Sequence, residues 1–389
     1  MANLKVLMMG GRRCGKTSVL SSLFHQMIHT SEIYEILTVA DKTILETKEV
    51  NGVIEIQESL SNKRLELQSF LETDRKGPEF LVDKGPTRHF WNYYMQVSLP
   101  GTNKTMNIEF RDSAGEFFDH GGNHTKETLD YLKDCDVFVI VVDTPYLMQN
   151  DDAIACAANV TDSIHSFITS IDEFSGDKQG AKLVLFVPMK CEKWIQEEKK
   201  IGIEDVKRRI YKLYAPTISN LQKRNNTEVS IIPVQTAGDI AFSQMRKAYT
   251  VATADGKVIK CSKVTDNLVI KSDSEMYYLQ EGDILNPDME AVFKFDDDSL
   301  DIERPSAWFR HTKNPPKYAP KNCEQVALHI LRFMFNKARN NQNTAWFNQF
   351  FRSIFGRITF NDLNNTIVEL TNSGLIKDTG DGIEIIKRL

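Results

Sequence analysis

The sequence lacks the features that mark several protein classes. Its six cysteines form no C-x-x-C pair, so zinc ligation is not expected, and a reduced protein of the cytoplasm is the expectation. A formal net charge of −5 supplies no basic surface, which gives no sign of a nucleic-acid or acidic-membrane partner. The apolar run at residues 4–9 stops at two glycines. It is too short to span a membrane, and no small-residue cleavage site follows it.

What the sequence does contain is a phosphate-binding motif. Residues 10–17 read GGRRCGKT, which fits G-x-x-x-x-G-K-[ST], between a strand-like run at 4–9 and a helical pattern at 18–28. Glycines allow a tight loop whose amides face phosphate oxygens, Lys16 neutralises the β- and γ-phosphates, and the Thr17 hydroxyl is placed to bind Mg²⁺. A chance match in a glycine turn is the alternative, which the flanking elements disfavour. The predicted nucleotide-binding residues in this segment are Gly10, Gly11, Arg12, Arg13, Cys14, Gly15, Lys16, Thr17 and Ser18.

A second motif ends a strand-like segment at residues 105–110. Residues 112–115 read DSAG, an Asp-x-x-Gly sequence with which P-loop GTPases sense the γ-phosphate. Asp112 would hold the metal through water, and the Gly115 amide would contact the γ-phosphate. The two motifs together resemble the TRAFAC class of P-loop GTPases, which contains the small Ras-like and the translation-factor GTPases.

The resemblance also indicates which groups surround the γ-phosphate. The residue after Asp-x-x-Gly often positions the attacking water as glutamine or histidine; here it is Glu116. A carboxylate orients or deprotonates water but repels the γ-phosphate, so slow hydrolysis is expected. Thr87 has the context of the family's metal-binding switch threonine, with Thr73 the weaker alternative. Arg12 and Arg13 either fold back as arginine fingers or, as we favour, point into solvent. The predicted catalytic residues are Lys16, Thr87, Gly115 and Glu116, and the predicted metal-binding residues are Thr17, Thr87 and Asp112.

Recognition of the base is where the chain departs from the family pattern, which is Asn/Thr-Lys-x-Asp after a strand. Residues 188–192 read PMKCE, so Lys190 can lie over the base and Glu192 can accept from guanine N1 and N2 in place of aspartate. Met189 cannot supply the bonds of the asparagine. Thr236 and Ala237 lie where the family reads guanine O6 with a backbone amide. Guanine is therefore favoured over adenine as the base.

The alternation of segments predicts the architecture. Apolar runs at 136–142, 182–187 and 230–234 are separated by helical patterns at 153–174 and 203–223, which indicates right-handed crossovers. We expect an α/β fold of the Ras-like P-loop GTPase kind, a mainly parallel sheet flanked by helices. The GTPase domain would span residues 1–340, with inserts at about 31–88 (helical over 43–71) and 241–310 (β-rich, with a hairpin at Asp255-Gly256). Residues 341–389 would form a helix-and-hairpin module that resembles a shortened winged helix.

The sequence thus predicts a molecular switch that binds GTP or GDP with Mg²⁺, slowly hydrolyses GTP, and is read by an unidentified protein partner. Residues 188–192 and 318–325 also resemble a bacterial group of double-GTPase proteins proposed to act in conflict systems, which implies a defence role. Two alternatives stay open: a P-loop enzyme that uses ATP, and a scaffold that binds nucleotide without turnover.

Overall fold

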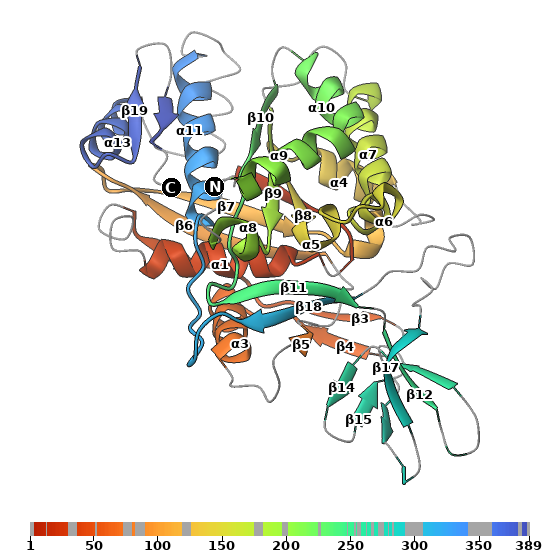
Figure 1. Ribbon diagram of the computed structural model, residues 1–389. Coiled ribbons are helices and arrows are strands. Elements are labelled where there is room, and N and C mark those ends of the chain that lie inside the picture. The colour runs from red at the N-terminus through yellow and green to blue at the C-terminus, as the bar shows by residue number, and fades with distance from the viewer. Residues whose placement is uncertain are drawn as a thin grey trace.

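A seven-stranded sheet runs through the centre of the molecule, in the order β10-β9-β8-β1-β7-β6-β2 (Figure 1). β1 pairs parallel with β7 and β8, and β9 pairs parallel with β8 and β10, whereas β6 is antiparallel to both β7 and β2. This mainly parallel sheet confirms the predicted α/β fold. The strands are β1 (Leu4–Met9), β2 (Val39–Asp41), β6 (Trp91–Leu99), β7 (Lys104–Asp112), β8 (Val137–Asp143), β9 (Lys182–Met189) and β10 (Thr227–Ile231).

The computed structural model describes the chain except for certain segments. These are residues 1–3, 13, 30–36, 51–52, 73–79, 82–89, 119–125, 175–181, 197–200, 225–226, 247, 253, 255–257, 262, 266–267, 271–275, 279, 282–283, 292–305, 341–359, 380–382 and 387–389. Within the described part of the chain, no helix combines the length and the apolar character needed to cross a membrane.

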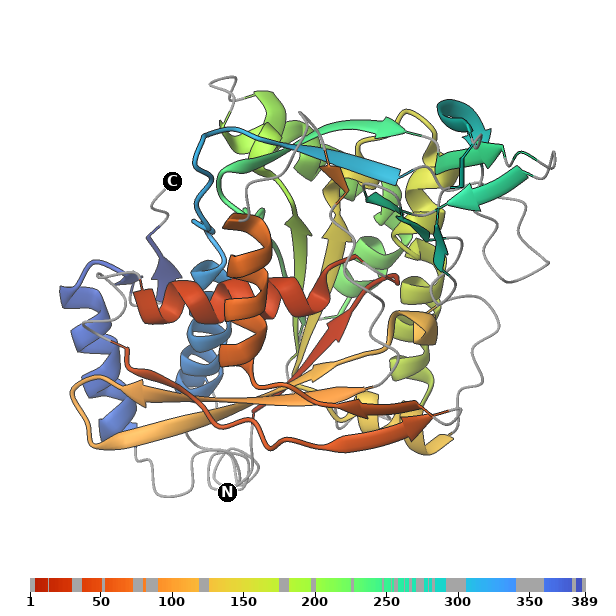
Figure 2. The same cartoon turned by 90° about the horizontal axis from the view of Figure 1, so that it is seen from below.

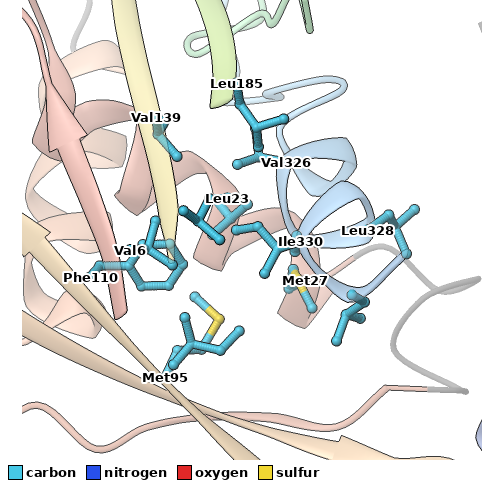
Figure 3. Close-up of a cluster of buried hydrophobic side chains, with 14 of the residues drawn as sticks. Val6, Leu23, Met27, Met95, Phe110, Val139, Leu185, Val326, Leu328 and Ile330 are labelled. Carbon is cyan, nitrogen blue, oxygen red and sulfur yellow. The ribbon is translucent and has the colours of Figure 1, made fainter. Parts of the chain in front are cut away.

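Helices cover both faces of the sheet (Figures 1 and 2). The side chains of β1 alternate between the two layers. Val6 and Met8 belong to an apolar cluster under α1 and α11, whereas Leu7 and Met9 belong to a second cluster under α7 and α9. Figure 3 shows side chains of α1, α11 and the sheet meeting in the first cluster. The two layers are α1 (Lys16–His29), α3 (Leu60–Glu72) and α11 (Glu324–Asn340), and α4 (Lys126–Lys133), α6 (Asp152–Ala158), α7 (Thr161–Phe174), α9 (Ile201–Leu213) and α10 (Ala215–Gln222).

Two long helical segments of the prediction are each divided in the structure. The segment at 153–174 is broken at Val160, whose φ of 46° is outside the helical range and is rare for a β-branched residue. The segment at 203–223 is broken after Leu213, and Pro216 lies in the first turn of α10. A proline has no N–H to continue a preceding helix, which explains this second break.

The first insert contradicts the prediction of a helix over residues 43–71. A β-hairpin of β3 (Thr47–Val50) and β4 (Val53–Ile56) precedes α3, which begins only at Leu60. The sequence between the two strands is Asn51-Gly52, a pair that favours a two-residue hairpin turn. The predicted helix begins too far toward the N-terminus because the apolar residues before Leu60 fit a helical stripe, whereas the turn signal favours a hairpin there.

The second insert is β-rich, as predicted. β11 (Ile240–Arg246) pairs with β18 (Ser306–His311), which also pairs with β5 (Phe80–Leu81) of the first insert. β12 pairs antiparallel with β13 on either side of the predicted hairpin, whose turn lies outside the described residues. The remaining strands of this insert are β12 (Ala248–Ala252), β13 (Val258–Cys261), β14 (Lys263–Thr265), β15 (Leu268–Ile270), β16 (Met276–Tyr278) and β17 (Ile284–Ala291).

The C-terminal segment contains the predicted helix and hairpin, α13 (Phe360–Asn372) with β19 (Ile376–Asp378) and β20 (Ile383–Ile385). The aromatic-rich helix predicted from Trp346 lies outside the described residues. The Leu370 side chain belongs to the same apolar cluster as α1 and α11. The segment therefore shares a core with the sheet, while a domain boundary near residue 340 stays a prediction.

The shared core gives a test of how this segment folds. Leu370→Ala removes a fully buried side chain and is expected to cost about 2–5 kcal/mol. The measurement is thermal unfolding of the whole chain, in which the main transition should shift. Val368→Ala, on the exposed face of the same helix, is the control and should change stability by less than about 0.5 kcal/mol. A main transition left unmoved by Leu370→Ala would show that the segment folds on its own.

Candidate functional site

The predicted phosphate loop lies between β1 and α1 and is tightly folded. Gly15 has a φ of +100°, and a Cβ there would lie 2.5 Å from the Met189 side chain. The Lys16 ammonium is buried and donates hydrogen bonds to the carbonyls of Gly10 (3.1 Å) and Gly11 (3.3 Å). The Val19 amide donates to the Gly15 carbonyl at 2.9 Å, which starts α1 at the end of the loop. The strand, loop and helix of the motif are therefore arranged as the sequence predicts.

Two of the predicted metal-binding residues meet beside this loop. Thr17 Oγ1 donates to Asp112 Oδ2 at 2.5 Å, although 95 positions separate the two residues in the chain. Asp112 is fully buried, and its Oδ1 atom has no hydrogen-bond partner within the described structure. Burial raises the pKa of Asp112, and the nearby Lys16 ammonium acts in the opposite direction. A buried carboxylate oxygen without a partner is costly, so this pair of oxygen donors fits a divalent cation such as Mg²⁺.

The Asp-x-x-Gly turn packs directly on the phosphate loop. A Cβ at Gly115 would lie 2.6 Å from the Arg12 amide nitrogen, so a larger residue could not occupy this position without displacing one of the two segments. Ser113 Oγ donates to the Met8 carbonyl at 2.6 Å and fixes the start of the turn to β1. Glu116 is the second residue of the short helix η1 (Gly115–Phe118). Arg13, Thr73 and Thr87 lie outside the described residues.

The residues predicted to read the base gather at the carboxyl ends of β9 and β10. The Lys190 ammonium forms an ion pair with Asp143 Oδ2 at 2.6 Å. Glu192 Oε1 accepts from the Ala237 amide at 2.7 Å and from the Gly238 amide at 3.4 Å. Burial raises the pKa of Glu192 to about 7, against the lowering effect of these amides. The structure thus brings the end of β8, residues 190–192 and residues 237–238 together. It also joins two of the groups that are predicted to read the base, the Glu192 carboxyl group and the Ala237 amide, to each other.

This contact has a consequence for the predicted roles of Glu192 and Ala237. A single N–H makes one strong hydrogen bond, and the Ala237 amide already makes it to the Glu192 carboxylate. Reading guanine O6 with this amide therefore requires Glu192 to move away from it. The additional methylene of glutamate, compared with aspartate, gives its carboxylate a longer reach.

A chain of hydroxyl groups joins residues 236–238, here called the base loop, to α1. Ser22 Oγ donates to the Thr236 carbonyl at 2.9 Å and accepts from the Tyr318 hydroxyl, also at 2.9 Å. Ser22 is fully buried and lies in the helix that begins at the phosphate loop. The predicted phosphate and base ends of the site are thus connected through one side chain.

Sequence reasoning missed residues that the structure places at the base end. Asp143 ends β8, and the carboxyl end of a parallel strand is where ligand-binding side chains gather, so its position was a usable signal. Gln235 directly precedes the base loop, and both polar atoms of its side chain are buried without a partner in the described part of the chain. Phe309 comes from the second insert, and its ring lies 5.9 Å from the Lys190 ammonium. No motif pointed to either of these two residues.

Comparisons with known proteins give matches of fold only. No family model matches the sequence, and no curated protein matches it. Among solved structures, the GTPase-like domain of S. cerevisiae Ski7, bound to GDP and inorganic phosphate, is 11% identical with a TM-score of 0.32, and the match covers 80% of this chain and 75% of that one. The same domain bound to GTP gives a TM-score of 0.33 at 11% identity and the same coverage. A bacterial selenocysteine-specific elongation factor, EF-Sec, is 9% identical with a TM-score of 0.29, over 80% of this chain and 45% of that one. TM-scores this low leave the case for a function to the geometry of the site.

The raised pKa of Glu192 predicts a dependence of stability on pH. The unfolded carboxyl ionises near 4.5, whereas the folded one keeps its proton up to about 7. The stability that Glu192 contributes is therefore complete below about pH 4.5 and is lost as the pH rises through 7. Thermal unfolding of the wild type and of Glu192→Gln between pH 5 and pH 8 measures this contribution of Glu192 to stability.

We expect the melting temperature of the wild type, relative to Glu192→Gln, to fall across that range. Glu204→Gln is the matched control, since its carboxylate is 61% exposed on α9, and it should show no such trend. A constant difference between wild type and Glu192→Gln from pH 5 to pH 8 would contradict the assignment.

Proposed function

We propose that this protein binds GTP and GDP together with Mg²⁺ and acts as a molecular switch. The observation that carries the proposal is the hydrogen bond between Thr17 and Asp112 at the start of α1. It lies beside the phosphate loop, where the Lys16 ammonium donates to the Gly10 carbonyl. A glycine loop, a buried ammonium and a pair of oxygen donors are the groups that a metal-bound triphosphate needs. They come from two motifs of the sequence and meet at one place.

Each group has a role in this proposal. The Lys16 ammonium exchanges the carbonyls of Gly10 and Gly11 for β- and γ-phosphate oxygens. Thr17 and Asp112 would hold Mg²⁺. When bound, the cation would supply positive charge that neutralises the phosphates. The buried position of Asp112 keeps its carboxylate away from bulk water.

The switch would lie where Gly115 contacts the phosphate loop. A γ-phosphate held by the loop would accept from the Gly115 amide, and its loss on hydrolysis would remove this bond and release the segment that follows. Thr87 would be the corresponding ligand from the first insert. A protein partner would recognise these two segments in one nucleotide state and not in the other.

Guanine is the base that suits the other end of the site. With Glu192 moved off the Ala237 amide, its carboxylate would accept from guanine N1 and N2, and the amide would donate to O6. Lys190, held by Asp143, would lie along the face of the base. Adenine presents an acceptor at N1, which a carboxylate repels.

One observation keeps the ATP-using alternative in consideration. Met189 stands where the family has asparagine. Its side chain packs against Gly15 and has no amide group that could bind guanine. A nucleotide-binding scaffold without turnover is the other alternative, and Glu116 is the reason to retain it. The role in a bacterial conflict system rests on the sequence resemblance alone.

Nucleotide binding itself is tested by removing the ammonium of the loop. Lys16→Ala is expected to weaken binding of GDP and GTP at least about 100-fold, because the phosphate charge is left uncompensated. Titration calorimetry with Mg²⁺ present measures the affinities. Lys212→Ala is the control, since this lysine is 61% exposed on α9. The affinity of this variant for GDP and GTP should equal that of the wild type. Unchanged affinity in Lys16→Ala would remove the basis of the proposal.

A second measurement tests whether the protein prefers guanine or adenine nucleotides. Thermal unfolding with GDP, GTP or ATP at one concentration should show stabilisation by the guanine nucleotides, because a ligand that binds the folded state raises the melting temperature. Equal or greater stabilisation by ATP would favour the ATP-using enzyme.

Hydrolysis is tested at Glu116. Single-turnover cleavage of GTP by the wild type should be slower than about one per second, since the carboxylate repels the γ-phosphate. Glu116→Gln is expected to be faster by about tenfold, which corresponds to about 1.4 kcal/mol of the barrier. An absence of cleavage in both proteins would favour the scaffold.

A further inference from the structure

Four phenylalanine rings form a cluster beside the Asp-x-x-Gly turn. Phe117 and Phe118 belong to η1, and their ring centroids are 5.0 Å apart. Phe90 directly precedes β6 and meets Phe117 edge-on, with centroids 5.2 Å apart and an angle of 79° between the rings. Phe167 of α7 meets Phe118 at 5.6 Å and Phe117 at 6.3 Å, also edge-on. This is an arrangement that aromatic pairs prefer, and Phe117 is the ring that contacts the other three.

The cluster fixes the chain on one side of Glu116. The Phe117 side chain is buried, and its amide donates to the Ala114 carbonyl at 3.1 Å, which closes the turn. On the other side of Glu116, the backbone of Gly115 packs on the backbone of Arg12 in the phosphate loop. Glu116 therefore lies between two anchored neighbours, one held by the phosphate loop and the other by the aromatic cluster.

Phe90 extends the cluster to the segment that carries the other predicted switch residue. Thr87 lies three positions before Phe90 in the sequence. β6 begins at Trp91, which pairs with Asp112 at the end of β7, so Phe90 and the Asp-x-x-Gly turn leave the paired strands at the same end. The Phe90 and Phe117 rings thus join the two segments that are predicted to surround the γ-phosphate.

We propose that Phe117 is a positioning residue for GTP hydrolysis, whose contact with Phe90 places residue 116 relative to the γ-phosphate and to the segment that carries Thr87. The inference rests on the proposed function, because it assigns a further residue to the same reaction. Phe117 acts through the backbone of its neighbour, and a displacement of about 1 Å at a reacting group is enough to slow a reaction. The phosphates themselves are bound by the loop around Lys16, so the effect is on the rate and not on the affinity for GTP.

The test measures Phe117→Leu in two backgrounds that differ at residue 116. Single-turnover cleavage at saturating GTP with Mg²⁺ gives the rate, and titration calorimetry gives the GTP affinity. In Glu116→Gln, Phe117→Leu should slow cleavage about 10-fold, because the glutamine side chain is no longer held in place. In Glu116→Ala, which has no side chain to position, it should change the rate less than about twofold. The GTP affinity should stay within about twofold of the parent in both backgrounds.

Two further variants support this comparison. Phe186→Leu is the matched control, since it makes the same substitution in the same apolar cluster, at a buried ring of β9 that meets Tyr214 at 5.1 Å. It should leave the rate of both backgrounds unchanged. Phe90→Leu removes the partner ring and leaves Phe117 itself intact, and it should slow Glu116→Gln as Phe117→Leu does.

The outcomes distinguish this inference from the proposed function. A wild type that does not bind GTP would overturn both. A Glu116→Gln protein that binds GTP and does not cleave it, or that cleaves it equally fast with Phe117→Leu, would overturn only the role of Phe117. Equal slowing in the Gln and Ala backgrounds, or a loss of GTP affinity, would reveal a general disturbance of the site and would also overturn that role. Should Phe117→Leu not fold, Phe90→Leu decides by the same comparison.

Discussion

The hydrogen bond between Thr17 and Asp112 is the contact on which the candidate site depends. It joins the first turn of α1 to the end of β7 and so holds the phosphate loop against the Asp-x-x-Gly turn. Asp112 ends β7 and Thr17 lies in the first turn of α1, which leaves them little freedom to separate. Because the Asp112 carboxylate is buried, its remaining oxygen needs a partner of positive charge, and this requirement gives the site its chemical character.

The parts of the site that were predictable are those encoded by contiguous residues. The loop at 10–17 is specified by its glycines, Lys16 and Thr17, and the strand and helix around it follow from short apolar patterns. The parallel sheet was predictable because strands covered on both faces are apolar throughout, as β8 is. The error at residues 43–59 had a local cause, since Asn51-Gly52 specifies a turn within a stretch whose apolar residues also fit a helix.

The base end of the site was less predictable because its contacts join segments far apart in the chain. Lys190 and Asp143 are 47 positions apart, and the Ala237 amide and Glu192 are 45 apart. The sequence identifies the candidates, but the exchange of a hydrogen bond between two of them depends on the side-chain conformation of Glu192 in the folded protein. Phe309 could not be found at all, because its proximity to Lys190 depends on how a long β-rich insert returns to the sheet.

The hydroxyl of Ser22 gives the molecule a mechanical property that neither end of the site has alone. Through it α1, the loop at Thr236 and the segment at Tyr318 share one buried set of bonds. A rotation or slide of α1 would leave a carbonyl and a phenol without partners in an apolar interior, which costs on the order of 1–3 kcal/mol for each group. An event at the phosphates that displaces α1 therefore either breaks these two hydrogen bonds or carries the loop at Thr236 and the segment at Tyr318 with it.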